Sequence, residues 1–440
     1  MSHIAIIVSG LTGRLHSSFE MATRLQSEGH SITYLCPEDV REKVEHQGFS
    51  YLQLPQIIFN FSPHALGVSW TKRFLYHIKN YANHYNIGKR ALGLAEYESI
   101  LKKLQPDVAL IDMELHDIIF AALAVNINVK LYTAWFSNKI STRLPPLRST
   151  IVPNKEGQGR RLHIVKAWCI IRAKVWARLL VNRLTFKNYR RSVLKTYAQR
   201  IGFPTRTLIP TNMPPLFTFT SLPIWTMNIK SMDFPHIPPK NLRYIGPMVH
   251  VGRDINNDVA ALEQKIDTIV ATKNQSHKKL IYCSVSSFVK GDVHFLKKVV
   301  QAVATESNWI LIMSLGRHIA VKDIGDIPPN VHLFDWVPQL SVLKASDCSI
   351  NHGGINSINE CIHFSVPMLV YSGKRFDQNG NAARIAYHGL GIRGDKDTDS
   401  LEEIRQNIRS IFTDTQFKEN IAMVHDMYKE YQQKKLSAYL

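Results

Sequence analysis

Residues 336–378 read WVPQLSVLKASDCSINHGGINSINECIHFSVPMLVYSGKRFDQ, and this stretch decides the fold. An apolar run at 348–351 ends at a glycine pair, Gly353 and Gly354, and a helical pattern follows. A second apolar run at 368–371 has the length of another buried strand. Strand, glycine turn and helix in this order are typical of a parallel sheet covered by helices on both faces. We therefore predict an α/β domain around this stretch.

The same alternation extends in both directions along the chain. Further strand-length apolar runs lie at 3–8, 31–35, 108–111, 130–134, 279–284, 309–314 and 331–334. A chain of 440 residues exceeds what one hydrophobic core usually serves. We therefore expect two Rossmann-like, doubly wound α/β domains, with ligands bound in the cleft beyond the carboxyl ends of the strands.

Eight prolines between residues 210 and 247 place the domain boundary, because proline at this density resists regular structure. We expect an N-terminal domain at 1–225, a linker at 226–250 and a second domain at 251–415. Helices at 416–440 are expected to return to the first domain.

The composition is ordinary for a globular protein, with 45% hydrophobic and 20% charged residues. The five cysteines show no CxxC spacing, so we expect reduced thiols in a cytoplasmic protein and no metal site. No apolar run is long enough to predict a membrane-spanning helix, and we expect no secretory leader.

A basic helical insertion is expected at 139–206, where 17 lysines and arginines meet one acidic residue. Apolar residues recur there at helical spacing: Ile164, Trp168, Ile171, Val175 and Leu179. The preferred interpretation is peripheral contact with an anionic membrane through 161–200. An anionic acceptor or a solvated face are the alternatives; nucleic-acid binding is less favoured because no reading motif is present.

The glycine pair could form part of a phosphate-binding site as well as a turn. Two glycines let a phosphate approach the backbone, and the following helix start offers unpaired N–H groups. His352, Asn356 and Ser357 would add side-chain donors, while Glu360 could accept from ribose hydroxyls. The competing interpretation is a capping box formed by Ser357 and Glu360.

Taken together, these residues resemble the nucleotide-binding signature of the UDP-dependent glycosyltransferases. That family includes plant secondary-product enzymes and bacterial macrolide and carotenoid glycosyltransferases. The matching residues run in order: Trp336-Val337-Pro338-Gln339, Val342-Leu343, His352 to Ser357, Glu360, Val366-Pro367-Met368, Asp377-Gln378 and Asn381-Ala382-Ala383. The resemblance covers most of the chain and implies the two-domain GT-B fold, with no metal or other cofactor.

The donor site that the resemblance implies consists of Trp336, Val337, Gln339, His352, Gly354, Asn356, Ser357, Glu360, Asp377, Gln378 and Ser287. Trp336 would stack on the uracil, with Gln339 near the nucleoside. His352, Asn356 and Ser357 would hold the pyrophosphate, and Glu360 the ribose. Asp377 and Gln378 would contact the sugar. Ser287 follows Ser286, which stands where the family usually has glycine.

The acceptor side departs from the family pattern. In the family, a histidine after the first strand is oriented by an aspartate and removes the acceptor's hydroxyl proton. Asp112 fits the aspartate, but Arg14, after Gly13, stands at the histidine position. Arginine stays protonated and is a poor base. His16 could replace it, another group such as His116 or the substrate itself could serve, or the chain could be catalytically weak.

The resemblance thus implies an inverting transferase that moves a hexose, with glucose favoured, from a UDP-sugar to a hydroxyl of an apolar acceptor. A TDP-sugar is less favoured. Two alternatives stay open: a membrane-associated enzyme that makes glycolipids, and a catalytically weak nucleotide-sugar-binding protein.

Overall fold

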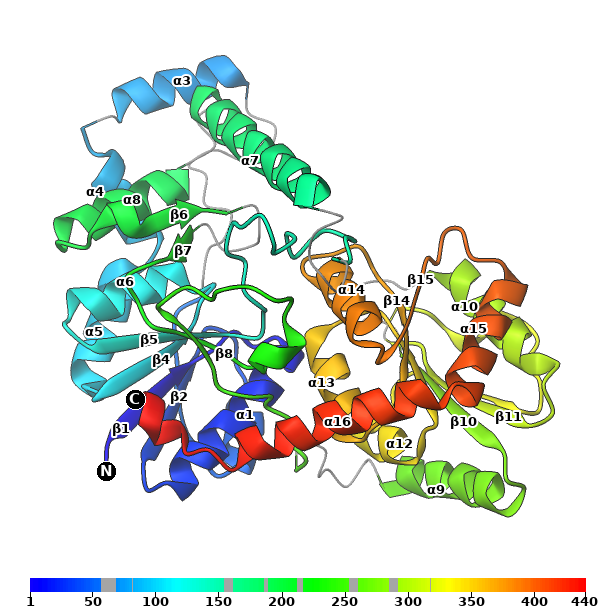
Figure 1. Cartoon of the computed structure of the whole chain (residues 1–440). Coiled ribbons are helices and arrows are strands. Elements are labelled where there is room, and N and C mark those ends of the chain that lie inside the picture. The colour runs from blue at the N-terminus through cyan, green and yellow to red at the C-terminus, as the bar shows by residue number, and fades with distance from the viewer. Residues whose placement is uncertain are drawn as a thin grey trace.

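The computed structural model describes residues 1–56, 69–80, 82–153, 161–185, 189–211, 217–252, 260–284, 292–316 and 318–440. It has two lobes, each built on a parallel sheet that is packed between helices (Figure 1). In β1, Ile4 and Ile6 face one hydrophobic cluster while Ala5 and Ile7 face another. Both faces of the sheet are therefore buried, and the predicted pair of doubly wound α/β domains is confirmed.

The first sheet has the strand order β3-β2-β1-β4-β5-β8-β9, with every pair parallel. Its strands are β1 (His3–Ile7), β2 (Ser31–Cys36), β3 (Ser50–Gln53), β4 (Val108–Asp112), β5 (Asn128–Thr133), β8 (Ile224–Thr226) and β9 (Leu242–Tyr244). Because β9 lies in the stretch expected as a linker, the first domain extends past residue 225. Prolines flank these short strands without interrupting their pairing.

The helices of the first domain are α1 (Thr12–Ser27), α2 (Arg41–His46), α3 (Trp70–Lys79), α4 (His84–Ala91), α5 (Leu94–Leu104), α6 (His116–Ala124), α7 (Arg161–Leu184) and α8 (Tyr189–Arg200). A small antiparallel pair, β6 (Leu208–Pro210) and β7 (Phe217–Phe219), packs beside them. Within the described residues, no helix is both long enough and apolar enough to cross a membrane.

The second sheet has the order β12-β11-β10-β13-β14-β15 and is also parallel throughout. Its strands are β10 (Lys279–Ser284), β11 (Trp309–Ser314), β12 (Val331–Phe334), β13 (Cys348–Asn351), β14 (Met368–Tyr371) and β15 (Gly391–Gly394). Its helices are α9 (Ala260–Gln275), α10 (Val293–Ala304), α11 (Val321–Ile324), α12 (Gln339–Ala345), α13 (Ile355–His363), α14 (Gln378–His388) and α15 (Leu401–Thr413). The strand order reverses between β10 and β13, as it does between β1 and β4 in the first sheet.

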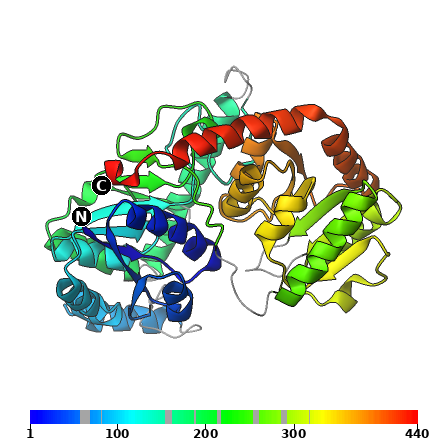
Figure 2. The ribbon, with the colours of Figure 1, turned by 90° about the horizontal axis from the view of Figure 1, so that it is seen from below.

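The last helix, α16 (Thr415–Gln432), runs from the second lobe to the first (Figures 1 and 2). Arg24 of α1 donates to the carbonyl oxygens of Tyr431 and Lys434, at 3.1 and 2.7 Å. The Glu28 carboxylate accepts two backbone N–H bonds from the turn after α16, each 2.7 Å long. The two ends of the chain therefore meet on the first domain and hold the lobes together.

Candidate active site

The two points of strand reversal face each other across the lobes. Gly13 and Arg14 lie in the first turn of α1, directly after β1, and Asp112 ends the neighbouring strand β4. From the other lobe, Asn356 of α13 donates from Nδ2 to the carbonyl oxygen of Gly13 over 2.5 Å. Ligands of such sheets bind where the strand order reverses, so the candidate site lies between these two loops.

The turn between β13 and α13 requires both of its glycines. Gly353 has φ +83°, and its N–H donates to Asn351 Oδ1 over 2.9 Å. A Cβ on Gly353 would lie 3.0 Å from the carbonyl oxygen of Gln378. A Cβ on Gly354 would lie 2.8 Å from Nε2 of His352. The backbone of this turn is therefore packed closely against Gln378 and His352.

Helix α13 begins without a side-chain cap. Gly354 is the residue before its first turn, and no side chain accepts from the first N–H groups. Ser357 lies inside the helix, and Glu360 bonds elsewhere, so the capping-box interpretation is wrong. Burial lowers the pKa of His352 to about 4, which leaves a neutral imidazole beside this turn. Uncapped N–H groups and the helix dipole together favour an anion at this position.

A polar pair lies close to the α13 turn. Nε2 of Gln339 donates to the carboxylate of Glu360, which is 4% exposed. The Tyr282 hydroxyl donates to Oε1 of the same Gln339 over 3.1 Å. Trp336 is 51% exposed, whereas Val337 is 2% exposed and packs in the core. The exposed Trp336 ring is available to stack on a base, whereas Val337 is buried.

The end of the signature lies beside the glycine turn. Asp377 precedes α14 and accepts from Nδ2 of Asn381 over 2.8 Å, and the same amide group donates to the Gly353 carbonyl over 2.9 Å. Oε1 of Gln378 accepts from the N–H of Arg375 over 3.3 Å. The structure therefore brings Asp377 and Gln378 next to Gly353, as a shared site requires. Ser287 lies outside the described residues.

On the acceptor side, one arginine holds two carboxylates. Nη1 of Arg14 lies 2.6 Å from Oδ2 of Asp112, and Nη2 pairs with Oε1 of Glu114. Burial raises the pKa of Glu114 to about 7, with Asp112 and Asp377 adding to the rise and Arg14 opposing it. Burial lowers the pKa of Arg14, but its two carboxylate partners outweigh that effect and raise it above its usual value. Arg14 therefore stays charged and cannot act as a base.

Sequence reasoning missed Glu114. It follows the end of β4 by two residues, in a turn where its own N–H donates to Oδ1 of Asp112 over 3.0 Å. Burial raises the pKa of Glu114, the charge of Asp377 adds to that rise, and this effect connects the acceptor-side cluster to the donor lobe. The spacing of Asp112 and Glu114 at a strand end was the available signal.

The two histidine candidates lie in different surroundings. His16 is partly exposed in α1, with its ring 6.4 Å from that of Phe19. Both oxygens of Asp112 already accept hydrogen bonds, from Arg14 and from the N–H of Glu114. His116 is 0% exposed, and its ring nitrogens lie 3.1 and 2.9 Å from two backbone carbonyl oxygens. His116 is a core residue that stabilises the turn after β4.

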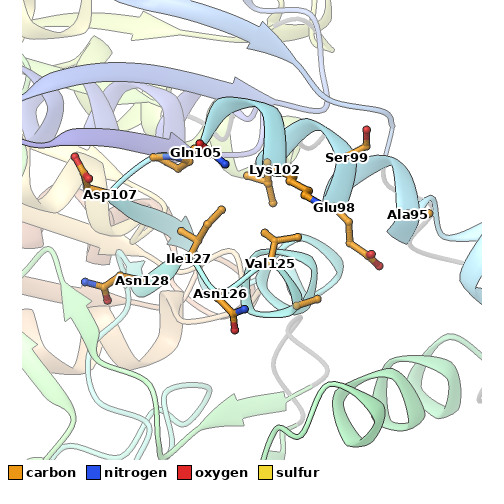
Figure 3. A pocket seen from close by; sticks show the side chains of 13 residues that line it. Ala95, Glu98, Ser99, Lys102, Gln105, Asp107, Val125, Asn126, Ile127 and Asn128 are labelled. Atoms are coloured by element: carbon orange, nitrogen blue, oxygen red, sulfur yellow. The ribbon is translucent and has the colours of Figure 1, made fainter.

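A separate surface pocket of about 840 Å³ lies between α5 and α6 (Figure 3). Its lining includes Asp107 and Asn128, which stand at the starting ends of β4 and β5. Asp112 stands at the other end of β4, so the pocket lies at the opposite edge of the sheet from the candidate site. No side chain of the candidate site lines it.

Comparison with known proteins agrees with this geometry. Residues 298–432 match the family model described as the erythromycin biosynthesis protein CIII-like C-terminal domain. The chain is 22% identical to the NDP-glycosyltransferase YjiC of Bacillus subtilis, over 97% of this chain and 93% of that protein. It is also 22% identical to the zeaxanthin glucosyltransferase of Pantoea ananas, over 96% and 91%.

Among solved structures, the glycotransferase of kitacinnamycin superposes with a TM-score of 0.66 at 20% identity, covering 99% of this chain and 97% of that one. The fold, the signature residues in their order and these full-length relatives agree. The chain therefore has the GT-B fold, and its similarity to these glycosyltransferases supports the UDP-dependent glycosyltransferase family.

Proposed function

We propose that this glycosyltransferase moves a hexose, with glucose favoured, from a UDP-sugar to a hydroxyl of an apolar small molecule, with inversion at the anomeric carbon. The observation that carries the proposal is the uncapped start of α13 beside the Gln339–Glu360 pair. An anion-favouring helix start and a buried carboxylate, next to an exposed tryptophan, match the three parts of a uridine diphosphate.

The donor is proposed to lie along the signature from base to sugar. Trp336 stacks on the uracil, and Glu360 accepts from the ribose hydroxyls with Gln339 beside it. The α13 N–H groups, Asn356, Ser357 and His352 bind the pyrophosphate. Gly354 leaves room for it. Asp377 and Gln378 hold the hexose hydroxyls, and Gln378 is the reason to favour glucose.

For the chemical step, Glu114 is the best-placed general base. The acceptor oxygen gives its proton to the Glu114 carboxylate and attacks the anomeric carbon. The bond from that carbon to the diphosphate oxygen breaks on the opposite face, and UDP leaves with the electron pair. Positive charge at the α13 start stabilises the departing diphosphate. Arg14 orients Glu114 and Asp112 through its two guanidinium nitrogens.

His16 is the competing base, with Asp112 as its partner. Arg14 pairs with both Asp112 and Glu114. Besides burial, the charge of Asp377 in the other lobe adds to the rise in the pKa of Glu114. Single variants His16→Ala and Glu114→Gln separate the two assignments, because only the true base lowers turnover without weakening UDP binding.

The test is product formation. The enzyme is incubated with UDP-glucose, UDP-galactose, UDP-glucuronic acid or TDP-glucose, each with a panel of phenols, macrolides, carotenoids and sterols, with and without EDTA. Mass spectrometry detects the glycosylated acceptor, and NMR coupling constants give the anomeric configuration. We expect a β-glucoside from UDP-glucose and no effect of EDTA. UDP binding without product on any acceptor would instead make the chain a nucleotide-sugar-binding protein.

A membrane-bound acceptor is the second candidate, which would make the enzyme a glycolipid-forming transferase. The observation that favours it is helix α7, which carries six cations and an exposed apolar face.

A further inference from the structure

Two helices at the tip of the first domain carry a large share of the exposed apolar surface. Among the described residues, 11 of the 24 large apolar side chains that are at least about a third exposed belong to α3 or α7. The end of α7 meets the start of α3 (Figure 1), where Nε1 of Trp70 in α3 donates to the Leu184 carbonyl of α7 over 3.0 Å. Such a concentration of apolar surface marks an interaction site.

Helix α7 has two apolar faces. The inner one is the stripe predicted from the sequence; Ile164 and Trp168 are buried, and its later members are partly buried. The outer one also follows the three- and four-residue spacing of a single helix face: Leu162, Val165, Cys169, Ala173, Trp176, Leu180 and Leu184. All of these outer residues are exposed, with Trp176 at 63% and Leu180 at 58%. The inner face holds the helix to the protein, and no part of the described chain covers the outer face.

Cations border the outer face. At 100° per residue, Arg161, Arg172 and Arg183 line one edge and Lys166 lies at the other, with Lys174 and Arg178 further round the helix on that second side. Neither α3 nor α7 contains an aspartate or glutamate, while α3 adds Lys72, Arg73 and Lys79. An apolar stripe with cations on both sides is the pattern of a helix that lies in the surface of an anionic bilayer. A second copy of this chain would bring like charges together, so self-association is disfavoured.

Helix α8 does not share this surface. It belonged to the segment 161–200 that the sequence suggested for membrane contact, but Val193, Leu194 and Tyr197 are buried in the core. Arg190 pairs with the buried Asp117, so that cation serves the fold. The surface therefore shifts from 161–200 to α3 and α7.

The position of α7 connects this surface to the cleft. Nε1 of Trp168 donates to the Leu144 carbonyl over 2.8 Å. Three residues further on, the Leu147 carbonyl accepts from the N–H of Gly380 in α14 over 2.9 Å. The start of α7 thus lies beside the donor lobe, and its end lies at α3.

We propose that α3 and the outer face of α7 seat the protein on an anionic membrane. The apolar stripe enters the boundary between headgroups and acyl chains, and the bordering lysines and arginines bind lipid phosphates. An apolar acceptor dissolved in that membrane would then reach the cleft along α7.

Cys169 supplies a direct probe. It is the exposed member of the five cysteines and lies on the outer face, while the other four thiols are buried. We would label it with an environment-sensitive fluorophore and add vesicles of phosphatidylcholine, alone or mixed with phosphatidylglycerol. We expect the fluorescence emission to shift to the blue with the anionic vesicles but not with the neutral ones. About 0.5 M salt should reverse the shift, because salt screens exposed charges. The binding measurement needs neither UDP nor an acceptor, so its outcome is independent of sugar transfer.

Variants locate the surface. Trp176→Ser with Leu180→Ser should abolish the shift, and Lys174→Gln with Arg178→Gln should weaken vesicle affinity about 30-fold, at roughly fivefold for each cation. Ile237→Ser is the matched control, because that side chain is 82% exposed elsewhere. Circular dichroism checks that each variant is folded. The proposal is overturned by absent binding, by equal binding to neutral vesicles, by full binding of the Trp176 and Leu180 double variant, or by a lipid-free dimer that shields Cys169.

Discussion

Replacing Glu114 by glutamine tests the assignment of the base most sharply. Glutamine keeps the size of the side chain but cannot accept a proton at neutral pH. Arg14 keeps its bond to Asp112, so the turn after β4 should hold its shape. Donor residues lie on the other lobe, and we therefore expect UDP affinity to stay within about twofold of wild type.

The magnitude follows from the burial and charges around Glu114. A positioned base contributes about 100- to 10,000-fold to the rate, so kcat/KM should fall by that factor in Glu114→Gln. In the wild type, the pKa of Glu114 is raised to about 7, chiefly by burial, then by Asp112 and Asp377 against Arg14. The active, deprotonated form is lost as the pH falls below that value. Activity at pH 6 should be about a tenth of that at pH 8.

The assay is the pH profile of kcat/KM for the best acceptor found, measured for wild type, Glu114→Gln and His16→Ala. The fall of kcat/KM at low pH, the acid limb of the profile, should persist in His16→Ala. In Glu114→Gln it should disappear together with most of the activity. Neutral His116 is no competing source of this limb, because burial lowers its pKa to about 4. A Glu114→Gln enzyme with near wild-type turnover and an unchanged acid limb would refute the reasoning.

Three further predictions concern the donor lobe and the domain interface. Glu360→Ala should weaken UDP about 10- to 100-fold but TDP much less, measured by calorimetry, because only UDP offers the ribose 2′-hydroxyl to this carboxylate. Gly354→Ala should weaken UDP more than tenfold in the same assay, because its Cβ would lie 2.8 Å from Nε2 of His352. Arg384→Met should destabilise the fold by about 3–5 kcal/mol in chemical unfolding, because it leaves the 1%-exposed Asp233 side chain without its cation.

Each has a contradicting outcome. If Glu360→Ala weakened UDP and TDP binding equally, Glu360 would not bind the ribose 2′-hydroxyl. Unchanged UDP affinity in Gly354→Ala would mean that the turn relaxes freely. Adding Asp233→Asn to Arg384→Met should restore most of the stability; no recovery would show that the loss came from packing between Phe136 and Phe234 instead.

Much of the fold follows from local pattern. Buried parallel strands read as short apolar runs, and the glycine pair marks the turn into α13, so both domains were predictable. The strands β8 and β9 were not, because three residues among prolines carry no periodicity of their own. They form only because β5 offers an edge to β8, and β8 in turn offers one to β9.

The sequence offered a full set of candidate residues on the donor side, but its set on the acceptor side lacked Glu114. The signature residues lie within one continuous stretch, so their order alone brings them together. Glu114 gains its role only when Arg14, 100 residues earlier, reaches it. Likewise, the surface proposed for membrane contact joins α3 to α7 across 114 residues, through a contact between Trp70 and Leu184 that no local pattern encodes.

The central claim is that the second lobe binds a uridine diphosphate through Trp336 and the start of α13. The direct measurement is thermal unfolding of wild type and Trp336→Ala with UDP, TDP and GDP. UDP at about 100 times its Kd should stabilise the wild type by about 2.7 kcal/mol, more than TDP or GDP at the same concentration. Trp336→Ala should lose about 1–2.4 kcal/mol of that stabilisation at equal UDP, since base stacking contributes about 1–3 kcal/mol to affinity. A wild-type melting temperature that no nucleotide moves would contradict the account.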